Sequence, residues 1–198
     1  EAPLLADVQI AGSKQITDQE LLDRVQLRAG DPADSFLIGR GDGTFEDATG
    51  RLAGNTQQPS NGAVSCDYDN DGDQDIFVST YSVSTQLGLN ILWENDGQGN
   101  FNDVSLAAGI SRTHQGTGVA VADYNNDGHL DIYVLNRSQA TDDYADALLL
   151  SNGDGTFADV TAASGTGNMG TSLAVSSFDY DGDGYQDIYV ANEFELDA

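Results

Sequence analysis

Three acidic segments of nine residues carry the residue types that bind a hard metal ion, at 67–75, 123–131 and 179–187. Each has the pattern Asp-x-Asp/Asn-x-Asp-Gly-x-x-Asp, and their first residues, 67, 123 and 179, are 56 positions apart. Oxygens at segment positions 1, 3, 5 and 9, with the backbone carbonyl at position 7, can converge on one Ca²⁺ at about 2.3–2.6 Å. Glycine at position 6 allows the sharp turn that this convergence needs. The pattern therefore predicts three calcium-binding loops.

Turn formation alone would explain a single segment of this kind, because Asp, Asn and Gly are common turn residues. Three copies in one register favour metal binding instead. The first and third segments each offer four carboxylates, whereas the second has Asn125 at position 3 and offers three. Because ligand charge tunes calcium affinity, we expect the second site to be the weaker one.

A second motif, Gly-x-Gly-x-Phe, recurs with the same period at 41–45, 97–101 and 153–157. Short aliphatic and aromatic runs bounded by Gly, Asn and Asp accompany the two motifs, which is the pattern of strands and hairpins. In one repeat these runs are 118–122, 132–135, 147–150 and 156–160. Four short strands per repeat predict an all-β protein made of β-propeller blades, with aliphatic side chains packed between blades.

Position 12 of each segment separates these loops from a helical EF-hand. An EF-hand places a bidentate Glu there and continues into a helix. Here position 12 is Val78, Val134 or Val190, each inside a strand-like run. The loops are therefore expected to join two strands, with the Asp at position 9 ligating the metal directly.

On these motifs the chain resembles the FG-GAP/VCBS repeat family, whose repeats also build the calcium-bearing propeller of integrin α subunits. A closer likeness is to secreted proteins of the cartilage-acidic-protein type. The resemblance extends over residues 36–198 and implies about three Ca²⁺ ions held in hairpins at the propeller rim. It implies side-chain ligands at Asp67, Asp69, Asp71, Asp75, Asp123, Asn125, Asp127, Asp131, Asp179, Asp181, Asp183 and Asp187. It implies backbone carbonyl ligands at Asp73, His129 and Tyr185.

The number of repeats bears on the architecture. The family resemblance implies seven blades, and seven blades of this length would need about 390 residues. We therefore expect these repeats to be part of a larger propeller, with closure into a small ring as the alternative. Residues 1–35 do not repeat, and a capping box at 17–20 predicts a helix over 18–28, after a strand near 8–10. A short α/β segment at 1–35 is thus expected before the repeats at 36–198.

Composition restricts the partners. The chain has 33 acidic and seven basic residues, for a formal net charge of −26. This charge argues against nucleic acid and anionic membranes as partners and suits cations or basic protein patches. No apolar run approaches the roughly 18 residues that a membrane span requires. Cys66 is the only cysteine, and we expect it to be a small buried residue.

These observations favour a calcium-binding, non-catalytic propeller module that is extracellular, at the cell surface or periplasmic. It would act in adhesion or as a structural subunit of an extracellular assembly, with a protein partner. The alternative is a carbohydrate-binding module, or the propeller domain of a secreted carbohydrate-active enzyme, with a glycan as ligand. In that alternative Trp93 and the tyrosines would stack on sugar rings.

Overall fold

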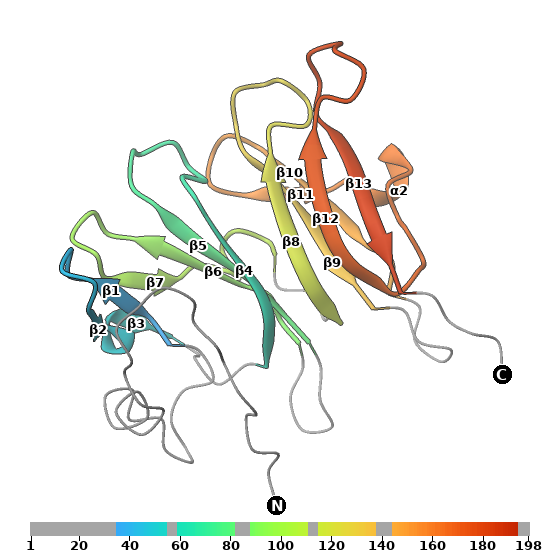
Figure 1. The fold of residues 1–198 in the computed structure, drawn as a ribbon. Coiled ribbons are helices and arrows are strands. Elements are labelled where there is room, and N and C mark those ends of the chain that lie inside the picture. Colours follow the sequence, from blue (N-terminus) through green and yellow to red (C-terminus); the bar gives the residue numbers. More distant parts are fainter. Residues whose placement is uncertain (1–34, 55–58, 82–87, 111–114, 138–143, 194–198) are drawn as a thin grey trace, which may run out of the picture. The chain divides into compact units, whose positions relative to one another are not determined.

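The computed structural model describes residues 35–54, 59–81, 88–110, 115–137 and 144–193, all within the unit Pro32–Ala198. The strand expected near 8–10 and the helix expected over 18–28 lie outside the described residues. Antiparallel sheets dominate the fold (Figure 1). The predicted all-β fold class is confirmed. Among the described residues, no helix is long and apolar enough to cross a membrane.

Two sheets each contain a complete four-stranded repeat. Both are antiparallel meanders, ordered β4-β5-β6-β7 and β8-β9-β10-β11. The strands are β4 (Ser60–Cys66), β5 (Asp75–Thr80), β6 (Ile91–Asn95), β7 (Phe101–Asp103), β8 (Gly116–Ala122), β9 (Asp131–Asn136), β10 (Ala147–Ser151) and β11 (Phe157–Asp159). Each strand of the second sheet has a counterpart 56 positions earlier in the first, so the sequence repeat is a structural repeat, as expected of propeller blades.

The other strands form partial repeats and additions. β12 (Ser172–Phe178) and β13 (Asp187–Asn192) correspond to the first two strands of a blade, and β1 (Leu37–Gly39) and β2 (Phe45–Asp47) to the last two. A 3₁₀ turn η1 (Thr49–Arg51) leads into β3 (Leu52–Ala53), which pairs in parallel with β7. The short helix α2 (Thr161–Ser164) follows β11. The sequence patterns did not predict β3 or these single helical turns, since each is too short to show a period.

The main apolar cluster lies between the two complete blades, as the sequence predicted. Phe77 and Leu92 from the first sheet share it with Ile132, Val134 and Leu149 from the second. All five side chains are at most 2% exposed. A second cluster connects the second blade to β12 and β13 in the same way. Burial of apolar surface between blades therefore holds neighbouring repeats together.

The first strands of successive repeats, β4, β8 and β12, lie next to one another (Figure 1) and make direct polar contacts. The Asn61 amide donates to the Gly116 carbonyl at 2.8 Å, and the Thr117 hydroxyl donates to the Ser172 carbonyl at 2.6 Å. Asn61 and Thr117 occupy equivalent repeat positions. The same blade-to-blade hydrogen bond is thus made twice by different side chains.

Close packing between β8 and β5 leads to a prediction for Gly116→Ala. A Cβ atom at Gly116 would lie 2.6 Å from the carbonyl oxygen of Thr80 and would also overlap the Ser79 hydroxyl. Because backbone must move to make room, we expect a loss of about 1–3 kcal/mol in the free energy of unfolding, measured by urea denaturation.

Gly50→Ala is the matched control, since a Cβ atom there meets nothing within 4 Å. Its free energy of unfolding should stay within about 0.5 kcal/mol of the unsubstituted chain. Equal losses in the two variants would show that the junction between β5 and β8 is not tightly packed.

Candidate metal-binding loops

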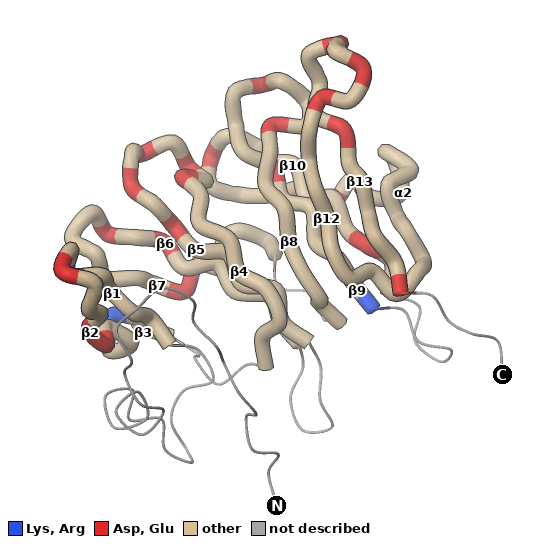
Figure 2. Tube along the Cα trace, in the orientation of Figure 1, with Lys and Arg blue, Asp and Glu red and all other residues tan. Residues whose placement is uncertain are grey.

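The three acidic segments form the hairpin loops β4–β5, β8–β9 and β12–β13, here called the first, second and third loop. All three lie at the same end of their sheets, the upper edge in Figure 1. Figure 2 shows that acidic residues also concentrate along this edge. The repeat therefore brings the predicted ligands of every loop to one side of the described structure.

Left-handed backbone at loop positions 4 and 6 gives the loops their common shape. Only Gly, and less readily Asn, adopts positive φ at low cost. The φ values are 63° at Asn70, 57° at Asn126 and 76° at Gly182 for position 4, and 96° at Gly72, 89° at Gly128 and 91° at Gly184 for position 6. The residue types at these two positions are thus the ones that the turn requires.

Backbone N–H groups hold the loop carboxylates in place. At position 1, a carboxylate oxygen accepts from the N–H at position 6: Asp67 from Gly72 at 3.1 Å, Asp123 from Gly128 at 2.9 Å and Asp179 from Gly184 at 3.0 Å. The side chain at position 3 accepts from the N–H at position 5, and position 5 accepts from position 7, in every loop. One hydrogen-bond pattern therefore recurs three times.

The aspartate at position 9 ties each loop to its blade. Asp131 is fully buried, and its two oxygens accept from the backbone N–H groups of Tyr124 at 2.9 Å and Ser151 at 2.8 Å. Asp75 makes the equivalent bonds, to Tyr68 at 3.2 Å and Asn95 at 2.8 Å. These carboxylates connect the loop to the third strand of the same blade. Each oxygen still has a free lone pair, so this role is compatible with metal ligation.

Burial affects how readily these two groups ionise. Burial raises the pKa of Asp75 to about 6, against the opposing effect of its two backbone hydrogen bonds. Burial also raises the pKa of Asp131, with nearby Asp127 and Asp123 adding to the shift. Asp187 is exposed, and its oxygen accepts from the N–H of Tyr180 at 2.7 Å. A nearby cation would favour the charged form of the two buried groups.

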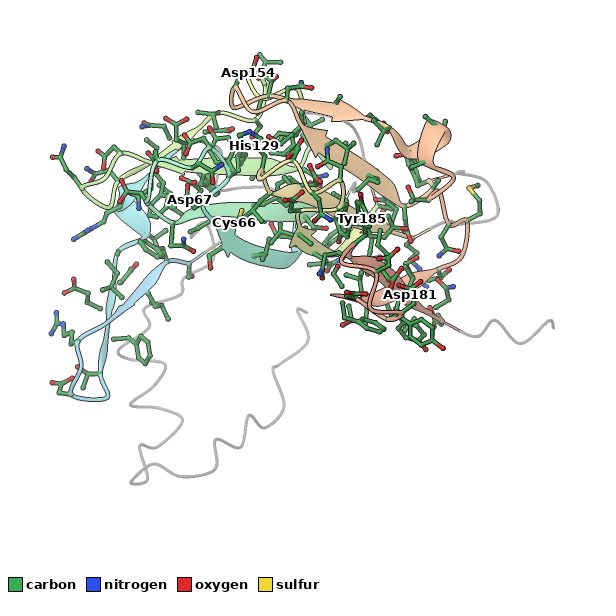
Figure 3. All side chains as sticks on the ribbon, turned by 90° about the horizontal axis from the view of Figure 1, so that it is seen from above. Cys66, Asp67, His129, Asp154, Asp181 and Tyr185 are labelled. Atoms are coloured by element: carbon green, nitrogen blue, oxygen red, sulfur yellow. The ribbon has the colours of Figure 1, made fainter. Side chains whose placement is uncertain are left out.

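Carboxylates at positions 1, 3 and 5 converge in two of the loops. Asp67, Asp69 and Asp71 each place an oxygen within 4.8 Å of the others, and Asp179, Asp181 and Asp183 do the same. Figure 3 labels Asp67 and Asp181, one from each group. Position 9 is not part of either group.

One oxygen in the first loop supports the fit to a cation. Asp67 Oδ1 is buried without a hydrogen-bond partner, although buried polar oxygens are normally bonded. A bound cation would supply its missing partner. Clustered carboxylates are hard oxygen donors, which suit Ca²⁺ or Mg²⁺ better than softer metals. The residues present therefore fit calcium.

The second loop differs through Asn125. Its amide donates to Asp127 Oδ2 at 2.8 Å, so one oxygen of a predicted ligand already accepts a hydrogen bond from within the loop. The backbone N–H of His129 and this amide lower the pKa of Asp127. The loop thus has one carboxylate fewer and an internal donor that competes with calcium.

Position 7 was predicted to contribute its carbonyl rather than its side chain. The side chains of Asp73 and His129 lie close to glycines of the neighbouring turn in their own blades, Gly97 and Gly153, and Tyr185 is about half exposed. Their N–H groups donate to position 5. Position 4 received no role from the sequence patterns, although Asn recurs there at 70 and 126.

Comparison with known proteins places the fold and the loops in a family. The FG-GAP-like repeat family matches residues 22–78, 67–134 and 139–190, which together cover most of the chain. The class defined by the blades and loops is a propeller-type repeat protein. The chain belongs to the FG-GAP-like repeat family.

Curated relatives match over shorter stretches. Cartilage acidic protein 1 of Mus musculus and of Homo sapiens are both 43% identical over 56 residues, which is 28% of this chain and 9% and 8% of those proteins. The Xenopus tropicalis protein is 39% identical over 64 residues, 32% of this chain and 9% of that protein. The likeness predicted from the motifs is confirmed, and the matched segment spans less than a tenth of each relative.

The bonds made by position 9 predict a strong effect of Asp131→Ala. The change leaves the buried N–H of Ser151 and the partly buried N–H of Tyr124 without an acceptor, and an unsatisfied buried group costs about 1–3 kcal/mol. Relief from burying a charge offsets part of this, so we expect a net loss of about 1–3 kcal/mol. Urea denaturation in excess chelator measures it without a metal contribution.

Asp187→Ala is the control at the same loop position. Asp187 is exposed, so water can replace it at the Tyr180 N–H, and the loss should stay below about 1 kcal/mol. If both variants lost the same stability, the buried bonds of Asp131 would not be what holds the loop.

Proposed function

We propose that this chain is a calcium-stabilised, non-catalytic propeller segment of an extracellular protein that acts in adhesion or as a structural subunit of an assembly. The observation that carries the proposal is the convergence of three carboxylates in the first loop, one of which, Asp67, has a buried oxygen, Oδ1, without a hydrogen-bond partner. The third loop repeats the carboxylate group, and all three loops share one hydrogen-bond pattern.

Bound calcium would raise the stability of the folded chain. Carboxylates held within 4.8 Å of one another repel, and the backbone N–H groups around them neutralise only part of that charge. An ion bound to the folded loop but not to the unfolded chain stabilises the fold in proportion to its affinity and concentration. The loops would then be rigid connections at the rim.

The non-catalytic part of the proposal is supported by how buried acidic groups are used. Asp146 is a fully buried carboxylate outside the loops. It accepts from the Asn136 N–H at 2.7 Å, from the Ser172 hydroxyl at 2.8 Å and from the Asn168 amide at 3.3 Å. These bonds connect the residue that precedes β10 to β9 and β12, so its role is structural. Trp93 is 1% exposed and belongs to a core cluster, which removes it as a sugar-stacking platform.

The extracellular part rests on likeness to cartilage acidic protein 1 and on a calcium affinity that we expect to be low. Calcium modules outside the cell bind at about 10⁻⁴–10⁻³ M, which partly solvated loops of this type can match. The match is confined to one repeat-length segment.

The partner that we propose is a protein with basic groups. A crevice of about 400 Å³ lies between the first loop and the β10–β11 turn, and its walls carry Asp69, Glu94 and Asp154. Tyr68 donates to Glu94 at 2.7 Å within it. The described residues include three cationic side chains, Arg40, Arg51 and Arg137, and two of these pair with glutamates. Charge complementarity would therefore favour a basic surface at this edge.

Calcium titration of the full chain tests the proposal. We expect calorimetry to show calcium binding at up to three sites, with the second loop the weakest. Saturating calcium should raise the melting temperature by about 5–10 °C per occupied site, because ligand at 100 times Kd adds about 2.7 kcal/mol. Asp69→Ala should remove one site.

Asp96→Asn is the control, since Asp96 lies in the β6–β7 turn, outside the three loops. It should leave the number of sites unchanged. Absence of calcium heat together with a melting temperature indifferent to chelator would refute the proposal. Binding to a glycan array that survives chelation and Asp69→Ala would favour the carbohydrate-binding alternative.

A further inference from the structure

Side-chain hydrogen bonds link each loop to the next. The Asn70 amide in the first loop donates to the Gly128 carbonyl of the second at 3.2 Å and lies 3.0 Å from the ring nitrogen Nδ1 of His129. The Asn126 amide in the second loop donates to the Gly184 carbonyl of the third at 2.9 Å. Both asparagines are at loop position 4, and both accepting carbonyls are at position 6.

These bonds run between the predicted metal sites. Asn70 stands between Asp69 and Asp71, two converging carboxylates of the first loop. The carbonyl that it holds is one residue before His129, whose own carbonyl is the predicted ligand at position 7 of the second loop. Asn70 thus belongs to the first loop's predicted site, and the peptide that it holds belongs to the second.

The third loop shows whether the loop conformation requires an asparagine at position 4. Gly182 stands at position 4 there, with φ 76°, and has no side chain. The third loop nevertheless keeps the converging carboxylates and the internal hydrogen bonds. The asparagine amide is thus not required for the loop conformation, and its bond to the next loop calls for another explanation.

We propose that Asn70 and Asn126 are positioning residues that couple calcium binding between neighbouring loops. Calcium at the first loop fixes Asn70 and so preorganises the second loop, and Asn126 does the same for the third. This rests on the proposed function, since it requires that the loops bind calcium. Linkage makes the coupling reciprocal. One net hydrogen bond corresponds to a change of about threefold to tenfold in affinity.

The test uses the full chain and one reporter per loop. Backbone amide signals of Gly72, Gly128 and Gly184 in ¹H–¹⁵N spectra follow occupancy of the three loops separately during calcium titration. The calcium affinity of the second loop is measured in the unsubstituted chain, in Asp69→Ala, in Asn70→Gly and in the double variant. Glycine keeps the left-handed backbone of position 4 while removing the amide.

Coupling predicts that the effects of the two substitutions on calcium affinity at the second loop are not additive in a double-mutant cycle. Asp69→Ala and Asn70→Gly should each weaken calcium binding at the second loop by about threefold to tenfold, and the double variant should be no weaker than either. With the second loop disabled by Asp127→Ala, Asn70→Gly should change the affinity of the first loop by less than about twofold. Asn126 links the second loop to the third. In an Asn126→Gly background, Asp69→Ala should therefore still weaken calcium binding at the second loop.

Two outcomes would overturn the inference, and they are distinguishable from failure of the proposed function. If the calcium affinity of the second loop is unchanged by Asp69→Ala, the loops bind calcium independently. Coupling that persists in Asn70→Gly shows that another contact carries it. If none of the three glycine signals responds to calcium, the proposed function itself fails, and the coupling fails with it.

Discussion

Crowding of carboxylates within a nine-residue turn is the constraint on which the rest of this structure depends. Three negative groups within 4.8 Å of one another are unfavourable unless donors or a cation compensate. The loop supplies backbone N–H donors through its positive-φ residues, and it leaves Asp67 Oδ1 without one. The edge position of the loops follows from the same constraint, because charge of this density is tolerated next to water and not inside an apolar core.

Within each loop the carboxylates have different tasks. In the first and third loops, the carboxylates at positions 1, 3 and 5 converge. Position 9 is buried in the two complete blades and accepts from the backbone of the loop and of the third strand. The loop is therefore anchored at one end by the protein and open to a cation at the other. A metal bound at the open end would act on a part of the hairpin that the blade core does not reach.

Equivalent positions in the three repeats differ because their surroundings differ. Tyr68, at loop position 2, is 4% exposed and stacks on Phe157 of the next blade, whereas Tyr180 is 80% exposed. Likewise Phe77 and Tyr133 are buried and their counterpart Tyr189 is 62% exposed. Among the described residues, no strand pairs with the outer edge of β13 and no blade follows it. Burial of a repeat position is thus decided by the neighbouring blade, not by the residue.

The sequence by itself determined the repeat, the strands and the composition of the loops, because strand periodicity, turn glycines and acidic spacing are local properties. It predicted that Val134 and Ile132 would pack between blades, which the core confirms. It assigned the same role to the aspartates at positions 1, 3, 5 and 9. Only the tertiary structure showed that Asp75 and Asp131 also fasten the loop to β6 and β10. The bonds from Asn70 and Asn126 to the next loop were likewise decided by tertiary packing, because they join residues 58 positions apart that meet only when blades stack.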